Sequence, residues 1–318
     1  MFWEKTKKIS ADDVVWCFAN ILGRHPHSTS EIKIYLQSCS DFRELVTKIV
    51  STSECVTRKT TAAVDFVYDD SESTQRNILG ILKKLQPMKA AEHKKTRIGK
   101  EYDGGYIMLD DFDGITAAYS IGIFNEVSWD LNIADRGIVV YQYDHTIDSL
   151  PIQHPLFKWL KKGLGASVTS ELETLPRLIE KNGHQGRSDL ILKCDIEGCE
   201  WEVLPELPRE CLRQFKQIVL EIHFLEHLTD PQFATRVERS IDVLTADHRV
   251  VHVHANNHRP YCIVGGVPLP SVLELTLARV HDVRLEINEE VFPSQLDTPC
   301  YRGRGDFHLG LFRFQESV

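Results

Sequence analysis

Two carboxylates stand in the sequence where a buried strand is expected to end. The segment LILKCDIEGCEWEVL, residues 190–204, begins with aliphatic residues and then places Asp195 and Glu197 directly before Gly198. Aspartate is depleted in strands, so acids at this point are typical of ligands or catalysts. The alternative is that they cap the next helix, on whose surface Glu200 is expected to lie. We interpret Asp195 and Glu197 as catalytic residues.

The later expected strands carry further polar side chains. QIVLEIHF, residues 217–224, places an acid and an imidazole on one face, which is costly in a buried strand unless both are paired or used. Because an imidazole titrates near neutral pH, His223 is the first candidate for a general base and Asp195 the second. VVHVHANN, residues 250–257, adds imidazoles and paired amides that can bind hydroxyl groups. The residues expected to bind a hydroxyl-rich substrate are Glu221, His254, Asn256 and Asn257.

The same side chains offer ligands for a divalent metal ion. Carboxylates and imidazoles are the right ligand types for such an ion, and the candidates are Asp195, Glu221, His223 and His254. Their spacing matches no short metal-binding motif, so structural or general-base roles are favoured over metal binding. The chain has 8 cysteines without a CxxC pair, so neither a zinc knuckle nor a disulfide framework is expected.

An upstream glycine and a following acid indicate a nucleoside site. Gly122 follows an expected strand, and Asp144 ends the next strand about 20 residues later, where an acid can accept hydrogen bonds from a ribose. The three glycines of the dinucleotide fingerprint are not present, which favours S-adenosylmethionine over NAD as the cofactor. An NAD-dependent oxidoreductase is the alternative. The expected cofactor-binding residues are Asp103, Gly104, Gly105, Tyr106, Gly122, Phe124, Asn125, Asp144, His145 and Asp195.

A mostly parallel sheet is needed to bring these residues together. From about residue 95, β-rich runs alternate with helical stretches, which predicts an α/β fold with helices on both faces of the sheet. Ligands bind beyond the carboxyl ends of the strands in such sheets. The expected helices are 126–136, 171–183 and 231–246. The expected strands are 115–121, 138–144, 190–196, 217–224, 249–255 and 310–314.

The front of the chain has the pattern of short amphipathic helices. Apolar periodicity and capping residues predict helices over 10–24, 30–39, 41–51 and 74–87. Residues 52–61 are polar and are the candidate linker. We therefore expect a helical module over 1–58, a linker and first helix over 59–94, and the catalytic domain over 95–318. The helical module is the candidate for forming an oligomer.

Composition limits the class of protein. The chain has 318 residues, of which 42% are hydrophobic and 26% charged, ordinary values for a soluble globular protein. Its net charge of -9 argues against a nucleic-acid partner. No apolar run approaches the ~20 residues of a membrane span, and no signal-peptide core follows the N-terminal MFWEKTKK. These features predict a cytoplasmic protein without a transmembrane segment.

Several motifs occur in the order found in one known family. In chain order they are DGGYIM, YSIGIFNEVSWD, YQYDHT, LKCDIEGCEWEVL, LEIHF, VHANN and PSVLELTLAR. Over about residues 90–315 the chain thus resembles the FkbM-type methyltransferases and related eukaryotic methyltransferase-like proteins. The resemblance implies a class I, Rossmann-like fold, dependence on S-adenosylmethionine, and O-methylation of a sugar hydroxyl in a glycan or glycosylated metabolite, as in polysaccharide biosynthesis.

The resemblance also assigns positions. Residues 103–106, Gly122 and Asp144 match cofactor positions of the family, and residues 195–198 match the segment that borders its active site. Ser120 and Phe124 depart from the pattern, since an acid and a second glycine are common there. The front segment resembles a small helical domain of bacterial surface-polysaccharide and secreted proteins, which fits a glycan context. A non-catalytic glycan-binding or scaffold protein is therefore a further alternative.

Overall fold

A seven-stranded sheet forms the centre of the protein. The computed structural model describes residues 8–22, 25–50, 52, 66–67, 71–259 and 261–314. The strands lie in the order β12-β15-β11-β10-β5-β6-β7, and β15 is the antiparallel member between β11 and β12. Their bounds are β5 Ala117–Ile121, β6 Val139–Tyr143, β7 Phe157–Leu160, β10 Leu190–Cys194, β11 Phe215–Ile222, β12 His248–Ala255 and β15 Leu273–Arg279.

This strand order identifies the fold class. Along the chain, β5, β6, β7, β10, β11, β12 and β15 become strands one to seven, and the spatial order is then 3-2-1-4-5-7-6 with the seventh strand reversed. That order belongs to the Rossmann-like class I methyltransferase fold. The predicted α/β fold class is therefore confirmed.

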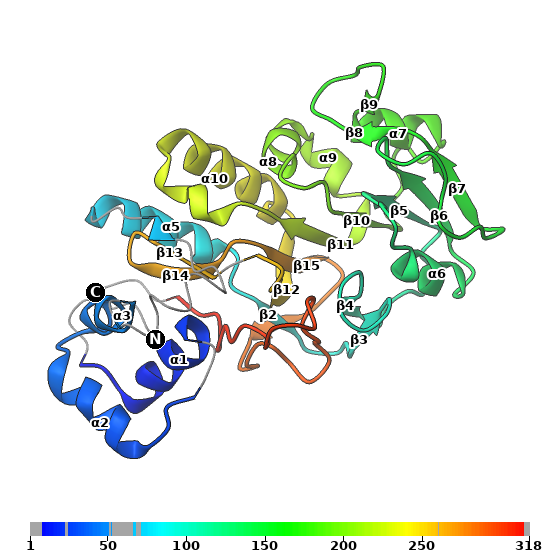
Figure 1. The fold of residues 1–318 in the computed structure, drawn as a ribbon. Coiled ribbons are helices and arrows are strands. Elements are labelled where there is room, and N and C mark those ends of the chain that lie inside the picture. The colour runs from blue at the N-terminus through cyan, green and yellow to red at the C-terminus, as the bar shows by residue number, and fades with distance from the viewer. Residues whose placement is uncertain are drawn as a thin grey trace.

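Helices cover both faces of the sheet (Figure 1). Tyr119 and Leu192 pack in an apolar cluster with one set of helices, whereas their neighbours Ala118 and Ile191 pack in a second cluster with α6, β3 and β4. Burial on both faces explains the nearly continuous aliphatic runs of the strands. The helices are α5 Glu72–Lys84, α6 Ser128–Ala134, α7 Leu175–Lys181, α8 Glu200–Val203, η1 Leu204–Glu206, α9 Arg209–Leu212, η2 Leu225–Thr229 and α10 Pro231–Thr245.

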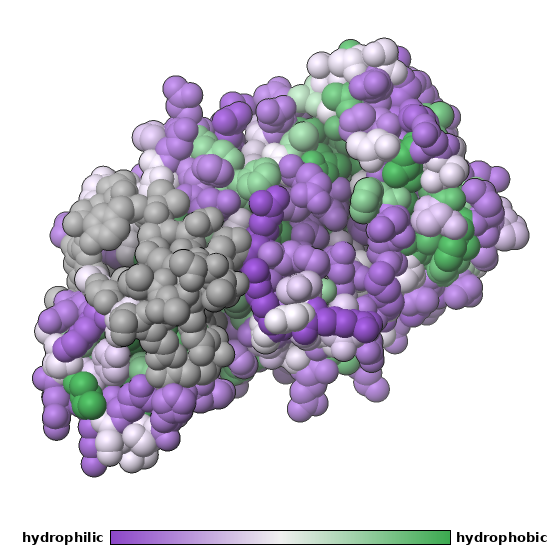
Figure 2. Space-filling model, in the orientation of Figure 1, coloured by the Kyte–Doolittle hydropathy of each residue, from purple (hydrophilic) through white to green (hydrophobic). Residues whose placement is uncertain are grey.

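Short strands form smaller sheets around the centre. They are β1 Phe66–Val67 with β13 Tyr261–Val264 and β14 Val267–Pro270, β2 Met88–Ala90 with β16 Leu285–Ile287, β3 Lys95–Ile98 with β4 Tyr106–Leu109, and β8 Gly163–Leu164 with β9 Leu172–Glu173. Figure 2 shows that most of one face of the molecule is hydrophilic, with smaller hydrophobic areas near α6 and α9. None of the helices in the described ranges is long and apolar enough to cross a membrane.

Three helices precede the sheet, namely α1 Ala11–Ile21, α2 Thr29–Ser38 and α3 Phe42–Val50. Ser10 caps α1 through a reciprocal pair of hydrogen bonds with Asp13, as the Ser-Ala-Asp-Asp start of the helix predicts. The helices share an apolar cluster that also contains Ile263, and Trp16 Nε1 donates a hydrogen bond to the carbonyl oxygen of His308. Most of the candidate linker, residues 53–61, lies outside the described residues, so the division into domains stays a prediction.

The strands of the structure differ from the predicted strands at several places. Residues 310–314 form no strand beyond a single bridge between Gly310 and Phe292; instead Phe312 and Phe314 pack into the main core, which satisfies their alternating aromatic pattern without strand pairing. The last strand of the sheet is β15, which sequence analysis did not identify as a strand, and the edge strand β7 was also missed. In addition, β10 ends at Cys194, before the two acids.

Burial predicts how unequally two leucines of the sheet contribute to stability. Leu220 in β11 is 1% exposed, whereas Leu160 in the edge strand β7 is 46% exposed. Leu220→Ala should lower the free energy of unfolding by about 2–5 kcal/mol, because it leaves a cavity in the core. The matched change Leu160→Ala should cost at most about 0.5 kcal/mol. Urea unfolding measures both, and similar losses would contradict the placement of β11 inside the sheet.

Candidate functional site

A cavity of about 750 Å³ lies at the carboxyl ends of β5, β6, β10 and β11. Its volume is within the roughly 300–1,000 Å³ of small-molecule sites. The predicted site residues that line it are Asp103, Gly104, Tyr106, Gly122, Phe124, Asn125, Asp144, His145, Asp195, Glu197, Glu221, His223 and Asn256. Those that do not line it are Gly105, His254 and Asn257. The roles assigned to these residues stay predictions, but most of the residues share one cavity.

Strand register explains why residues far apart in the sequence meet here. Gly122, Asp144, Asp195 and Glu221 each come one residue after a set of mutually paired residues in β5, β6, β10 and β11. They therefore form one row across the edge of the sheet. Glu274 of β15 is paired with Glu221 and extends this row. The expected cofactor positions and the expected catalytic acids are thus neighbours on adjacent strands.

The glycine at position 122 is required by the next strand. Gly122 has a φ of +81°, and a β-carbon there would lie 1.6 Å from the main-chain carbonyl oxygen of Asp195. The sequence indicates a nucleoside site at this glycine; in the structure, the absence of a side chain leaves room for the backbone of Asp195. A glycine here brings β5 and β10 together at the base of the cavity.

The carboxylate of Asp144 holds the loop that follows β5. Its Oδ2 accepts hydrogen bonds from the main-chain nitrogens of Ile123 and Phe124 at 2.9 and 2.8 Å. Its Oδ1 accepts from the main-chain nitrogen and the hydroxyl of Thr146 at 2.7 and 2.6 Å. Burial acts to raise the pKa of Asp144, but these hydrogen bonds outweigh burial and lower it. All four donors belong to the protein, so the expected ribose contact stays a prediction.

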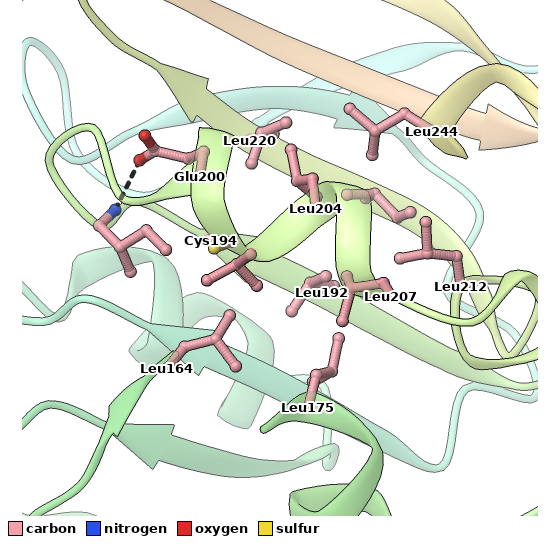
Figure 3. A pocket seen from close by; sticks show the side chains of 13 residues that line it. Leu164, Leu175, Leu192, Cys194, Glu200, Leu204, Leu207, Leu212, Leu220 and Leu244 are labelled. Atoms are coloured by element: carbon pink, nitrogen blue, oxygen red, sulfur yellow. Dashed lines mark hydrogen bonds between the residues drawn. The ribbon is translucent and has the colours of Figure 1, made fainter. Parts of the chain in front are cut away.

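A buried carboxylate organises the acidic loop after β10. Glu200 is 0% exposed; its Oε1 accepts from the main-chain nitrogen of Ile196 at 2.9 Å, and its Oε2 accepts from that of Gly198 at 2.8 Å. Figure 3 shows Glu200 beside a layer of leucine side chains. The expected surface position of Glu200 was wrong, because hydrogen bonds from the loop make its burial tolerable. Its place in the first turn of α8, directly after a glycine turn, was the available signal.

His223 lies between Glu200 and three further carboxylates. Its side chain is 3% exposed, and its Nδ1 lies 3.2 Å from Oε1 of Glu200. Its Nε2 lies 3.8 Å from Oδ1 of Asp195, 3.6 Å from Oε2 of Glu197 and 3.6 Å from Oε1 of Glu221. Burial acts to lower the pKa of His223, but the bond to Glu200 and the surrounding negative charges outweigh burial and raise it.

The carboxylates that face His223 are themselves perturbed. Burial raises the pKa of Asp195 to about 6, against the opposing effect of the Lys193 and His223 charges. Burial and the nearby Asp195 raise the pKa of Glu221 well above its usual value. Oδ1 of Asp195 is buried and has no hydrogen-bond partner within the part of the chain that the structure describes. The site thus concentrates carboxyl groups, and protein hydrogen bonds leave one of their buried oxygens unsatisfied among the described residues.

Two polar side chains and a lysine complete this wall. The hydroxyl of Tyr106 donates to Oε2 of Glu221 at 3.4 Å, and Nδ2 of Asn256 donates to Oε1 of Glu221 at 2.8 Å. Lys193, which sequence analysis missed, donates to the carbonyl oxygen of Gly122 at 2.9 Å. A lysine inside an otherwise aliphatic strand was the available signal, since burial of its charge requires a partner.

His254 and Asn257 hold the C-terminal segment. His254 Nδ1 lies 2.7 Å from Oε2 of Glu274, and its Nε2 lies 3.1 Å from Asp306. Asn257 donates to the carbonyl oxygens of Tyr301, Arg304 and Gly305. The structure thus does not bring His254 together with the other three predicted metal ligands, Asp195, Glu221 and His223.

Comparisons with known proteins give only weak structural similarities. No protein-family model and no curated protein sequence matches the chain. A mutant of the 16S rRNA (adenine(1408)-N(1))-methyltransferase of Catenulisporales acidiphilia is similar over 58% of this chain and 97% of that chain, with 14% identity and a TM-score of 0.30. Fibrillarin in a complex with Nop5p is similar over 61% of this chain and 98% of that chain, with 10% identity and a TM-score of 0.31. The fold assignment rests on the strand order.

Substituting two glycines separates backbone strain from close approach. Gly122 and Gly114 both have positive φ, +81° and +74°, but no atom lies within 4 Å of a β-carbon placed at Gly114. Gly114→Ala should cost roughly 1–2 kcal/mol for its backbone conformation alone. Gly122→Ala should cost clearly more, because β10 must also move away from β5. Chemical unfolding measures both variants; equal losses would show that the contact with Asp195 does not require the glycine.

Proposed function

We propose that the protein is an S-adenosylmethionine-dependent methyltransferase that methylates a sugar hydroxyl of a glycan or glycosylated metabolite. The observation that supports this most is the single cavity in which the Gly122–Asp144 wall adjoins a wall of acids and one imidazole. The first wall suits a nucleoside, and the second suits a hydroxyl whose proton must be removed. Both walls lie at the carboxyl ends of the strands, where ligands bind to α/β sheets, and this supports the proposal.

The proposed cofactor half of the cavity lies beside β5 and β6. The loop 122–125, held by Asp144, forms one side, and Leu164, Leu172 and Ile196 provide apolar surface that suits a purine ring. S-adenosylmethionine supplies a methyl group activated by a positively charged sulfonium. Carboxyl groups outnumber cationic side chains in the lining and favour that positive charge. The carboxyl groups are those of Asp103, Glu126, Asp144, Asp195, Glu197 and Glu221, and the cationic side chains are those of Lys193 and Arg259. The same excess of carboxyl groups would repel the pyrophosphate of NAD, so the lining favours the methyltransferase over the oxidoreductase.

The proposed acceptor half lies beside β10 and β11. Tyr106, Glu221 and Asn256 offer donors and acceptors for the hydroxyls of a sugar. Asp195 and His223 line the same part of the cavity. There they would assist removal of the proton from the acceptor hydroxyl. Alignment of the acceptor can supply roughly 7–11 kcal/mol of the barrier reduction, so exact positioning by these side chains matters as much as proton removal. The excess of carboxylates also disfavours a phosphate-rich nucleic acid as the acceptor.

Asp144 should be needed for cofactor binding through the loop that it holds. Asp144→Ala removes acceptors from three main-chain nitrogens and one hydroxyl, and hydrogen bonds to a charged group contribute roughly 1.5–3 kcal/mol each. We expect the dissociation constant of S-adenosylmethionine to rise at least ~10-fold by calorimetry. Asp148→Ala is the matched control, because Asp148 is 95% exposed and pairs with Lys161. Unchanged affinity of the Asp144 variant would refute this role.

His223 should be needed for turnover and not for cofactor binding. His223→Ala should lower methyl transfer about 10²–10⁴-fold, the usual effect of losing a group that assists proton removal, while calorimetry finds the affinity for S-adenosylmethionine retained. His227→Ala is the control, since His227 is exposed on η2. The assay follows labelled methyl from S-adenosylmethionine into a panel of saccharides. Transfer to none of them, together with NADH binding seen by tryptophan fluorescence, would favour the oxidoreductase instead.

A further inference from the structure

Three carboxylates converge on one edge of a buried imidazole without hydrogen bonding to it. Asp195, Glu197 and Glu221 approach Nε2 of His223 to 3.8, 3.6 and 3.6 Å, all beyond hydrogen-bond range. They come from the end of β10, the following loop and β11. No lysine or arginine of the described ranges forms an ion pair with any of the three. Carboxyl groups therefore outnumber cations around this nitrogen, where Lys193 supplies the nearby positive charge that acts on Asp195.

The cluster contains an orphaned acceptor. Oδ1 of Asp195 is buried and has no hydrogen-bond partner within the described ranges, although it faces His223. Leaving such a group unsatisfied is costly, more so for a charged one. A cation at the centre of the cluster would satisfy this oxygen and offset the repulsion among the three carboxylates.

The spacing suits a small ion. Ligand atoms of Asp195, Glu197 and His223 all lie within 4.8 Å of one another. Nitrogen and oxygen ligands about 2.0–2.2 Å from a metal stand roughly 3–3.5 Å apart, so modest side-chain rotation would close the observed gaps. Glu197 has a φ of +54°, a strained conformation for a residue other than glycine, of the kind that persists at functional sites.

The opposite edge of the imidazole is also prepared for metal binding. Nδ1 of His223 faces Oε1 of Glu200 at 3.2 Å. A carboxylate on the far nitrogen fixes the tautomer and orientation of a metal-binding histidine, and leaves the lone pair of Nε2 directed to the ion. Glu200 is itself fixed by the main-chain nitrogens of Ile196 and Gly198. The loop after β10 therefore positions Glu200, and Glu200 in turn positions His223.

We propose that Asp195, Glu197 and His223 bind one divalent cation of the Mn²⁺ or Mg²⁺ class, with Glu221 as the nearest further carboxylate. Oxygen-rich sets with a single imidazole suit Mn²⁺. The inference rests on the proposed function, which it deepens: the ion would orient the acceptor hydroxyl and favour loss of its proton. His223 then acts as a ligand of the ion, and its loss still abolishes efficient turnover.

A second cluster, His254, Glu274 and Cys300, provides an internal comparison. It also has three candidate ligand atoms within 4.8 Å, but Glu274 accepts from the Cys300 thiol at 3.2 Å and lies 2.7 Å from His254, whose other nitrogen faces Asp306. Every member of that cluster has a partner. An ion is therefore not needed there, and Cys300→Ala serves as a control for the pocket variants.

The test titrates Mn²⁺ into full-length protein after treatment with EDTA and removal of the chelator, with free Mn²⁺ measured by electron paramagnetic resonance. We expect one bound ion per chain, binding weakened at least ~10-fold in Asp195→Asn and His223→Ala, and unchanged binding in Cys300→Ala. Glu200→Gln should weaken binding about 10–100-fold through His223, whereas Glu202→Gln on the exposed side of α8 should not. Thermal unfolding checks that each variant is folded.

The outcomes separate this inference from the proposed function. No bound Mn²⁺ in the wild-type protein, or equal binding in folded Asp195→Asn, overturns the metal site. If no Mn²⁺ binds, while S-adenosylmethionine binds and methyl transfer continues with EDTA present, the metal site is wrong and the proposed function stands. If Mn²⁺ binds as expected but S-adenosylmethionine does not, the cation site stands and the proposed function is wrong.

Discussion

The site depends on the parallel register of β5, β6, β10 and β11. This register aligns Gly122, Asp144, Asp195 and Glu221 in one row, although they are widely separated in the sequence. A slip of one residue would turn the side chains of a strand to the opposite face of the sheet. The close approach of Gly122 to the Asp195 carbonyl oxygen also restricts this position to glycine. The sheet thereby fixes the cavity before any ligand arrives.

Around this row the protein treats carboxylates in two ways. Asp144 and Glu200 are satisfied by main-chain nitrogens, and Glu274 by His254 and the Cys300 thiol. These acids serve to shape loops, and their charge is balanced locally. The other group surrounds the imidazole of His223, and its members are Asp195, Glu197 and Glu221. Among them, Asp195 keeps a buried oxygen without a hydrogen-bond partner in the described part of the chain. This difference is the physical reason for proposing that the chemistry occurs beside His223.

Much of the sheet could be predicted from periodicity, but its ends could not. The aliphatic runs before Gly122, Asp144 and Asp195 are buried on both faces, so their composition alone indicates strands. The strand β15 was missed because its sequence, LELTLAR, contains an acid and a threonine, which are not typical of a buried strand. Both are buried in the structure, where neighbouring segments cover them. Residues 310–314 show the converse, since their aromatic side chains reach the core without strand pairing. Tertiary contacts decided both cases.

The sequence by itself determined the fold class and most of the residues that line the cavity, because both depend on local patterns: buried runs, glycine turns and acids at strand ends. Only the tertiary structure decided what each polar residue touches. In the structure, His254 and Asn257 do not line the cavity. Glu200, which was expected on a helix surface, is buried and contacts His223. The reason is that hydrogen bonds and charge balance arise between distant segments, which a linear pattern does not place relative to one another.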